Sequence, residues 1–308
     1  MATTISNKNI QKPSQSQEAV NAARLKTFWN ILGEIGKYVI LIPLAISFIF
    51  PIYWMFSSAL KDNPQVFTVP PVLVPNPAFW ENFIDAWNFL PFTTFTYNTI
   101  VLFVIPTTIL TVISTTLVAY GFAKISWRGR DTIFWLVLLT MMLPWAVKMV
   151  PTFLGLKWLG WLDTYRFWWA TALFGHPYLI FMLRQFFKGI PEDLSEAARI
   201  DGANEWMILW RVILPLAKPA LTVVALFRFI WAWNDYLGPR IFIRSQENFP
   251  LALGIDLLNS RANDVGACDR CLPYVMAVSA IVALPIIIAF FFAQRTFIEG
   301  ISLTGSKG

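Results

Sequence analysis

Charge is scarce in this sequence. Only 14% of the 308 residues are Asp, Glu, Lys or Arg, whereas soluble domains carry about 25%. Hydrophobic residues make up 56% of the chain, and the mean hydropathy is +0.56. The surface of a soluble domain of this length would need more charged side chains than this sequence contains. The composition therefore excludes an ordinary soluble protein and predicts an all-α membrane protein.

Histidine and cysteine are nearly absent as well. His176 is the single histidine, and the two cysteines, Cys268 and Cys271, stand together in the sequence Cys-Asp-Arg-Cys. A zinc site takes four ligands, so we predict no metal site. A membrane enzyme would need His, Asp or Cys side chains gathered near one membrane face. The sequence offers no such group, which leaves a polytopic membrane enzyme as a remote alternative.

Long uncharged runs are the most visible feature that is present. A helix of about 20 apolar residues crosses the hydrocarbon core, and three runs longer than this contain no charge at all. Three further apolar segments are interrupted by Lys148, His176 or Arg228; the long stem of Lys148 would let its charge reach a membrane surface. The sequence predicts six transmembrane helices, at about 38–60, 97–123, 132–155, 167–187, 219–240 and 272–294.

The distribution of Lys and Arg predicts the orientation. With a cytoplasmic N-terminus, the inner segments hold 15 basic residues and the outer segments hold 8. This bias places both termini in the cytoplasm, and anionic lipid beside the inner loops accounts for the net charge of +6 without nucleic acid. No cleavable signal peptide is recognisable. We expect residues 1–30 to be a disordered cytoplasmic tail and residues 31–308 to form the membrane domain.

Residues 188–218, between the fourth and fifth predicted spans, are too polar to cross the membrane. Pro191 is suited to a helix start, Gly202 to a turn, and Asn204 to the cap of a second helix. The pattern predicts two short cytoplasmic helices. Amphipathicity alone leaves open that this loop is an interfacial helix pair that only joins two spans.

The spacing of residues in this loop is specific. Glu196-Ala197-Ala198 is followed after three residues by Gly202, after nine more by Val212, and after one more by Leu214-Pro215. This resembles the EAA signature of ABC importer permeases, with Val212 where isoleucine is usual. The segments 53–61, 229–237 and 300–308 are also similar to the smaller permease of the maltose-type carbohydrate importers. The resemblance covers residues 38–308.

The resemblance implies a non-catalytic permease subunit in the cytoplasmic (inner) membrane, which moves a sugar or oligosaccharide by alternating access. Its expected partners are a second homologous permease, two ABC ATPase subunits that bind ATP and Mg, and an extracytoplasmic solute-binding protein. This chain has no Gly-x-x-x-x-Gly-Lys-Ser/Thr loop and should bind no cofactor. The residues expected to contact the ATPase are Glu196, Ala197, Ala198, Asp201, Gly202, Ala203, Val212, Leu214 and Pro215, with Gly305, Lys307 and Gly308 as candidate contacts of the tail.

Other candidate residues lie in or near the predicted spans. A charge at the middle of a span normally points into a bundle or a wet cavity, which makes Arg228 a candidate for the translocation pathway. Trp231 is a candidate because aromatic faces bind sugar rings. Asn234 and Asp235 match the Trp-Asn-Asp/Glu sequence of the family that this chain resembles, which implies a role in the gate or in subunit packing. A structural ion pair is the alternative role for Arg228. His176 precedes a proline and predicts a kink. Cys268 and Cys271 are a candidate disulfide, and tryptophans such as Trp168 are expected in an interfacial belt.

The identity of the solute stays open at this stage. The same scaffold would serve glycerol phosphate or a polyol, and a phosphate-bearing solute would call for a basic cavity. Arg228 alone does not decide between a neutral and a charged solute.

Overall fold

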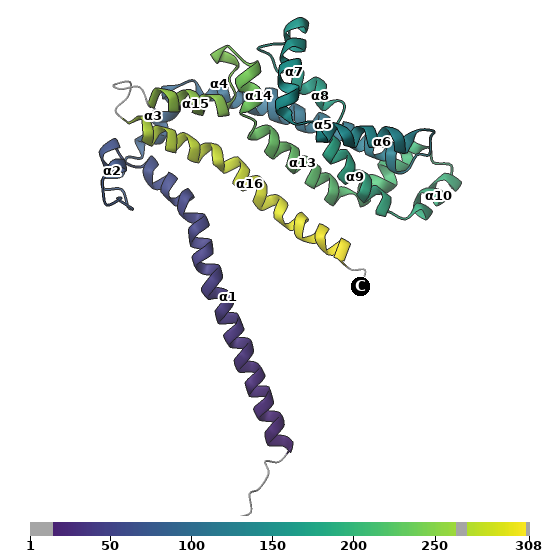
Figure 1. Cartoon of the computed structure of the whole chain (residues 1–308), viewed down its shortest axis with the longest axis horizontal. Helices are drawn as coiled ribbons and strands as arrows, with labels where there is room; N and C mark the ends of the chain where they lie inside the picture. The colour runs from purple at the N-terminus through teal and green to yellow at the C-terminus, as the bar shows by residue number, and fades with distance from the viewer. Residues whose placement is uncertain (1–14, 263–269, 306–308) are drawn as a thin grey trace, which may run out of the picture. The chain divides into compact units, whose positions relative to one another are not determined.

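The computed structural model describes residues 15–262 and 270–305, and every regular element in these two ranges is helical (Figure 1). The chain divides into two compact units, residues 1–54 and 55–308. The elements are α1 (Gln15–Ala59), α2 (Asn63–Phe67), α3 (Glu81–Phe89), α4 (Phe92–Tyr97), η1 (Asn98–Val104), α5 (Ile105–Ala123), α6 (Arg130–Leu139), η2 (Thr140–Met142), α7 (Trp145–Leu159), α8 (Arg166–Ala172), α9 (Pro177–Gly189), α10 (Glu192–Ile200), α11 (Glu205–Ile208), η3 (Leu209–Ile213), α12 (Leu214–Leu216), α13 (Lys218–Trp233), α14 (Leu237–Phe242), η4 (Gln246–Asn248), α15 (Leu251–Ala262) and α16 (Cys271–Gly305).

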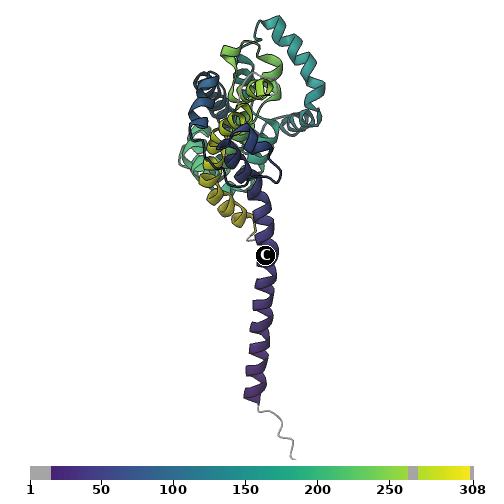
Figure 2. The same cartoon turned by 90° about the vertical axis from the view of Figure 1, so that its left-hand side faces the viewer.

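The first unit consists of most of α1, which Figure 2 shows as one continuous helix. Its apolar part, Ala22–Ala59, contains the predicted first span. The prediction of a disordered tail over residues 1–30 is wrong from Gln15 onward, because these residues are helical. Residues 18–26 are rich in Ala, Glu, Leu, Arg and Lys, which favour helix, and lengthening an existing helix needs no new nucleation.

Three helices are long and apolar enough to span a membrane: Ala22–Ala59, Phe92–Ala123 and Cys271–Phe292. They contain the three uncharged runs of the sequence to within two residues at each end of a run. Counting two sharply bent helix pairs as one span each raises the number to at most five in the described part of the chain. The count of six remains a prediction from the sequence.

Three of the predicted spans are not single helices. The 219–240 segment passes from α13 through a non-helical stretch at residues 234–236 into α14. The 132–155 segment divides into α6 and α7, which meet at 98°; Leu143 is extended because the following Pro144 disfavours helical backbone there. The 167–187 segment divides into α8 and α9 around Gly175, whose φ is +74°. Pro177 then opens α9. The predicted kink at His176 is therefore a complete break, and the carbonyl of Ala172 accepts a hydrogen bond from the Ser114 hydroxyl at 2.6 Å.

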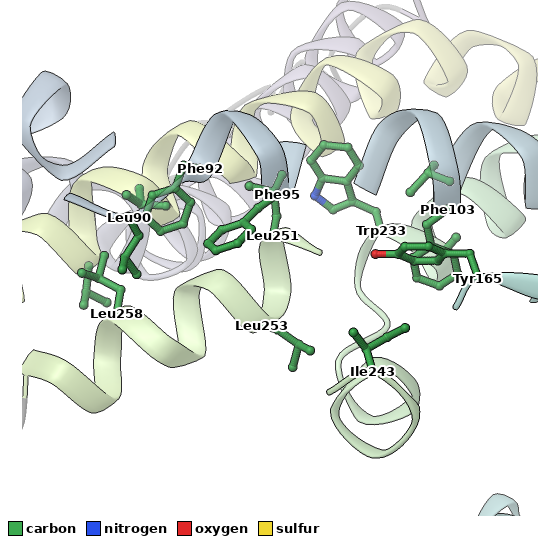
Figure 3. Close-up of a cluster of buried hydrophobic side chains, with 14 of the residues drawn as sticks. Leu90, Phe92, Phe95, Phe103, Tyr165, Trp233, Ile243, Leu251, Leu253 and Leu258 are labelled. Atoms are coloured by element: carbon green, nitrogen blue, oxygen red, sulfur yellow. The ribbon is translucent and has the colours of Figure 1, made fainter. Parts of the chain in front are cut away.

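Two large hydrophobic clusters, and a small third one made of Phe122, Phe134 and Ile180, hold the second unit together. One gathers aromatic side chains of α4, η1 and α8 with α15; Figure 3 shows Phe92 and Phe95 close to Leu251. A Cβ on Gly254 would lie 2.4 Å from the Phe95 ring, so only glycine fits this approach. The other cluster joins α5, α9, η3 and α13, and α16 lies beside α13 (Figure 1).

Candidate functional site

Helices α10 and α11 meet in a sharp turn, and we call residues 192–216 the corner. Gly202 has a φ of +84°, a left-handed conformation that glycine adopts without strain. The amides of Gly202 and Ala203 donate to the carbonyls of Arg199 and Ala198, which closes the end of α10. The Asn204 side chain caps α11 by accepting from the Met207 amide at 2.9 Å. The turn and the cap both match the sequence-based expectation.

Four charged side chains and one tyrosine connect the corner to the end of α5. Arg199 of α10 pairs with Glu192 at 3.2 Å and with Glu205 of α11 at 3.0 Å. The buried ammonium of Lys124 pairs with Glu192 at 2.9 Å, and the Tyr120 hydroxyl donates to Glu205 at 2.6 Å. The network therefore fixes α10 and α11 relative to each other and to α5.

Both carboxylates of this network are stabilised in their charged form. Burial by itself would raise the pKa of Glu192, but hydrogen bonds from Lys124 and Arg199 outweigh it and hold that pKa below its ordinary value. The pKa of Glu205 is lowered in the same way, by hydrogen bonds from Tyr120 and Arg199 against the effect of burial. The carboxyl groups of Glu192 and Glu205 are therefore ionised at neutral pH.

The residues of the predicted ATPase contact divide into an outer and an inner set. Ala198, Ala203, Val212 and Leu214 are half-buried against the second hydrophobic cluster, next to the fully buried Ile208 and Ile213. The inner set therefore attaches the corner to the membrane helices. The exposed set comprises Glu196, Ala197, Asp201, Gly202 and Pro215.

A neighbouring exposed residue was missed. Ile200, at the end of α10, is 87% exposed, although isoleucine is usually buried. It lies beside the small exposed residues of the turn. The outer face of the corner therefore offers small side chains next to one protruding apolar side chain.

A cavity of about 450 Å³ lies among α5, α7, α8, α9, α13 and α14. Its polar and aromatic lining includes Trp145, Lys148, Trp168, His176, Arg228 and Asp235. The His176 and Arg228 residues fall near the middle of their predicted spans.

The structure brings together some of the predicted pathway residues and not others. Arg228 and Asp235 line the same cavity, and their charges attract each other at a distance without a direct ion pair in the described structure. The Trp231 ring packs against His176 with centroids 4.8 Å apart. Asn234 lies outside the lining, and its side-chain amide donates to the carbonyl of Ile230 in its own helix. The sequence therefore located two lining residues and one neighbour of the cavity.

Three lining residues were missed or misplaced. Lys148, which was expected to reach a membrane surface, is an exposed residue of α7 that also lines the cavity. Trp168 was assigned to an interfacial belt, but it is 5% exposed and donates to Asp235 at 3.2 Å. Nothing in the sequence around Trp145 indicated that this residue lines the cavity. Only the positions of the helix breaks, at Pro144 and Pro177, could have suggested these placements.

Some candidates lie outside the described residues, namely Cys268, Lys307 and Gly308. Cys271 is disulfide-bonded and buried, and the pairing with Cys268 stays a prediction. Gly305 is the last residue of α16. The contact of the tail with an ATPase stays a prediction as well.

The comparison with known families decides what kind of protein carries this corner. The profile described as "Binding-protein-dependent transport system inner membrane component" matches residues 115–302, a range that contains the whole corner. The chain belongs to this family. It is therefore a membrane-spanning permease subunit of an ABC import system, with several helices in the inner membrane.

Individual relatives agree with the family. The sn-glycerol-3-phosphate transport system permease protein UgpE of Yersinia enterocolitica is 34% identical over 275 residues, which are 87% of this chain and 95% of the relative. The arabinooligosaccharides transport system permease protein AraQ of Bacillus subtilis is 34% identical over 274 residues, covering 86% and 92%. A chain of a bacterial ABC transporter that imports the acidic polysaccharide alginate matches with a TM-score of 0.74 at 26% identity, covering 92% and 99%.

Proposed function

We propose that this permease subunit imports a carbohydrate and that the corner is the docking point of separate ATP-hydrolysing subunits. The names of the relatives support the solute class, because they include an oligosaccharide permease and a glycerol-phosphate permease. The corner is the observation that carries the docking assignment. Catalysis would belong to the partner chains, and this chain would convert their motion into access across the membrane.

The geometry of the corner suits the transfer of force. Ala197 and Gly202 are exposed and small, so a partner backbone can approach closely. Behind them, the Arg199 ion pairs and the packing of Ile208 and Ile213 resist displacement of α10 and α11. A push on the outer face would therefore move α5, α9 and α13 as well.

The proposed assembly contains a second homologous permease, two ATPase subunits and an extracytoplasmic binding protein. The family description itself names binding-protein dependence. Both termini and the corner would face the cytoplasm, in agreement with the Lys and Arg distribution. Closure of the ATPase dimer on ATP would turn the cavity from inward-facing to outward-facing, and hydrolysis would reset it.

The docking assignment is tested by adding bulk to the outer face. Ala197→Trp adds a large side chain at an exposed position, so the chain itself should fold and insert normally. In proteoliposomes with all subunits, we expect loss of ATP-driven uptake and of co-purification with the ATPase. The matched control is Ala78→Trp, an exposed alanine of the predicted outer segment, which should keep both. Normal uptake and co-purification by Ala197→Trp would refute the docking assignment.

The solute is identified through the binding protein encoded with this chain. A thermal-shift panel of sugars, polyols and their phosphates should give one class that stabilises it. A glycerol phosphate is the second candidate, favoured by the relative at 34% identity. The absence of any carbohydrate or polyol ligand would count against the proposed solute class.

A further inference from the structure

The charges around the cavity do not balance. Arg228 and Lys148 are cationic, and Asp235 is the one acidic side chain in the described lining. The carboxylate of Asp235 already accepts hydrogen bonds from the Gly238 amide at 3.0 Å and from the Trp168 indole at 3.2 Å. Each of its two oxygens therefore already accepts one hydrogen bond from within the protein.

Arg228 is the least satisfied group at this site. Its Nε is buried and has no hydrogen-bond partner in the described structure. The Nδ1 of His176, in the same lining, is buried and unpartnered too. Polar groups buried without partners are costly, especially charged ones, and charged residues inside membranes usually serve a pathway or a bound ion. A ligand with negatively charged oxygens would supply the acceptor that the Nε–H of Arg228 lacks, and also one for His176 in the tautomer that carries its proton on Nδ1.

The size and the aromatic surroundings suit a sugar unit. A volume of about 450 Å³ falls in the usual range for small-molecule sites. Trp145 and Trp168 line the cavity, and Trp231 stacks on Phe227 with ring planes only 8° apart while it touches His176. Flat aromatic faces beside a guanidinium fit a ring with an acidic substituent.

We propose that the cavity binds an oxyanion of the solute, so that the imported carbohydrate is negatively charged. Arg228 is the principal ligand of the oxyanion, and Lys148 supplies a second positive charge at the exposed side of the cavity. A uronate carboxylate and a phosphate ester share this chemistry. The inference rests on the proposed import function and narrows its solute class.

The first part of the test asks which solute the system takes. The binding protein is screened by thermal shift with matched pairs: digalacturonate against galactobiose, and sn-glycerol-3-phosphate against glycerol. We expect the anionic member of one pair to win, and the winning pair identifies the carboxylate or the phosphate. Preference for the neutral member of a pair overturns the charged-solute inference while leaving carbohydrate import intact. Absence of every sugar and polyol ligand counts instead against the proposed function.

The second part measures ATP-driven uptake of the winning solute in proteoliposomes. Loss of a charge-assisted hydrogen bond should lower uptake by Arg228→Gln roughly ten- to hundredfold, and Arg228→Lys should recover part of it. Thr222→Gln, an exposed change in the same helix, is the control and should keep native uptake. Co-purification of all subunits shows that each variant is assembled. Native uptake by Arg228→Gln, or equal failure of Arg228→Gln and Arg228→Lys, overturns the role of Arg228.

Discussion

The corner and the cavity hold their charged side chains in different ways. In the corner, Glu192, Arg199 and Glu205 each have oppositely charged partners within 3.2 Å. In the cavity, Arg228 has no such partner among the residues that the structure describes. Charges that satisfy one another fix the geometry of a segment, whereas a charge without a partner retains its capacity for a ligand. The difference separates a rigid mechanical element from a binding site.

The largest expected effect comes from giving Arg228 in the cavity an acidic partner, as the charged residues of the corner have. Thr171 is an exposed residue of the lining, and Thr171→Glu adds a carboxylate that competes with an anionic solute for Arg228. Opposite charges within such a cavity interact by on the order of 1–3 kcal/mol, so uptake should fall about tenfold or more. Thr171→Gln has the same size without the charge and should keep most of the uptake. Equal uptake by the two variants would contradict the contrast between the regions.

The second largest effect comes from removing an acidic side chain of the corner, which leaves a cation there without its charged partner. Glu192→Ala removes the carboxylate that pairs with the buried ammonium of Lys124 and leaves that ammonium with the carbonyl of Ile190 alone. We expect a loss of about 1–3 kcal/mol in the local stability of α10, measured as faster amide hydrogen exchange in the purified protein. Asp193→Ala, which removes the neighbouring exposed acid, is the control and should change little. Equal exchange rates in the two variants would show that the ion pair does not stabilise the corner.

The smallest effect is a pH dependence confined to the corner. The folded pKa values of Glu192 and Glu205 lie below the ordinary value of 4.5. Their contribution to stability is therefore complete above pH 4.5 and is lost as the pH falls through the lowered pKa values. Exchange protection of α10 and α11, corrected for intrinsic rates, should stay constant from about pH 7 to about 5 and decline below 4.5.

A double variant supplies the control for this pH effect. Glu192→Gln combined with Glu205→Gln removes both titrating groups, so the decline below pH 4.5 should disappear. A decline of the native chain between about pH 7 and 5.5 would instead indicate a different titrating group. The experiment thus shows whether the ion pairs themselves hold the corner.

Much of the corner could be predicted because its signals are local. Gly202 and Asn204 act through their own backbone and side chain, within a few residues of their positions. The cavity carried weaker signals, because its lining comes from α5, α7, α8, α9, α13 and α14. Lys148 and Trp168 were assigned to the membrane surface by their residue types. Only the packing of separate helices placed them beside Arg228.

The sequence by itself determined the membrane class, the helical secondary structure, the turn of the corner and the family, because hydrophobic run length, glycine and capping residues act locally. Only tertiary packing determined which alanines of the predicted ATPase contact are covered, and that Lys148, Trp168 and Arg228 line one cavity. These features depend on contacts between residues far apart in the chain. The preferences of single residues for helix or turn do not reveal such contacts.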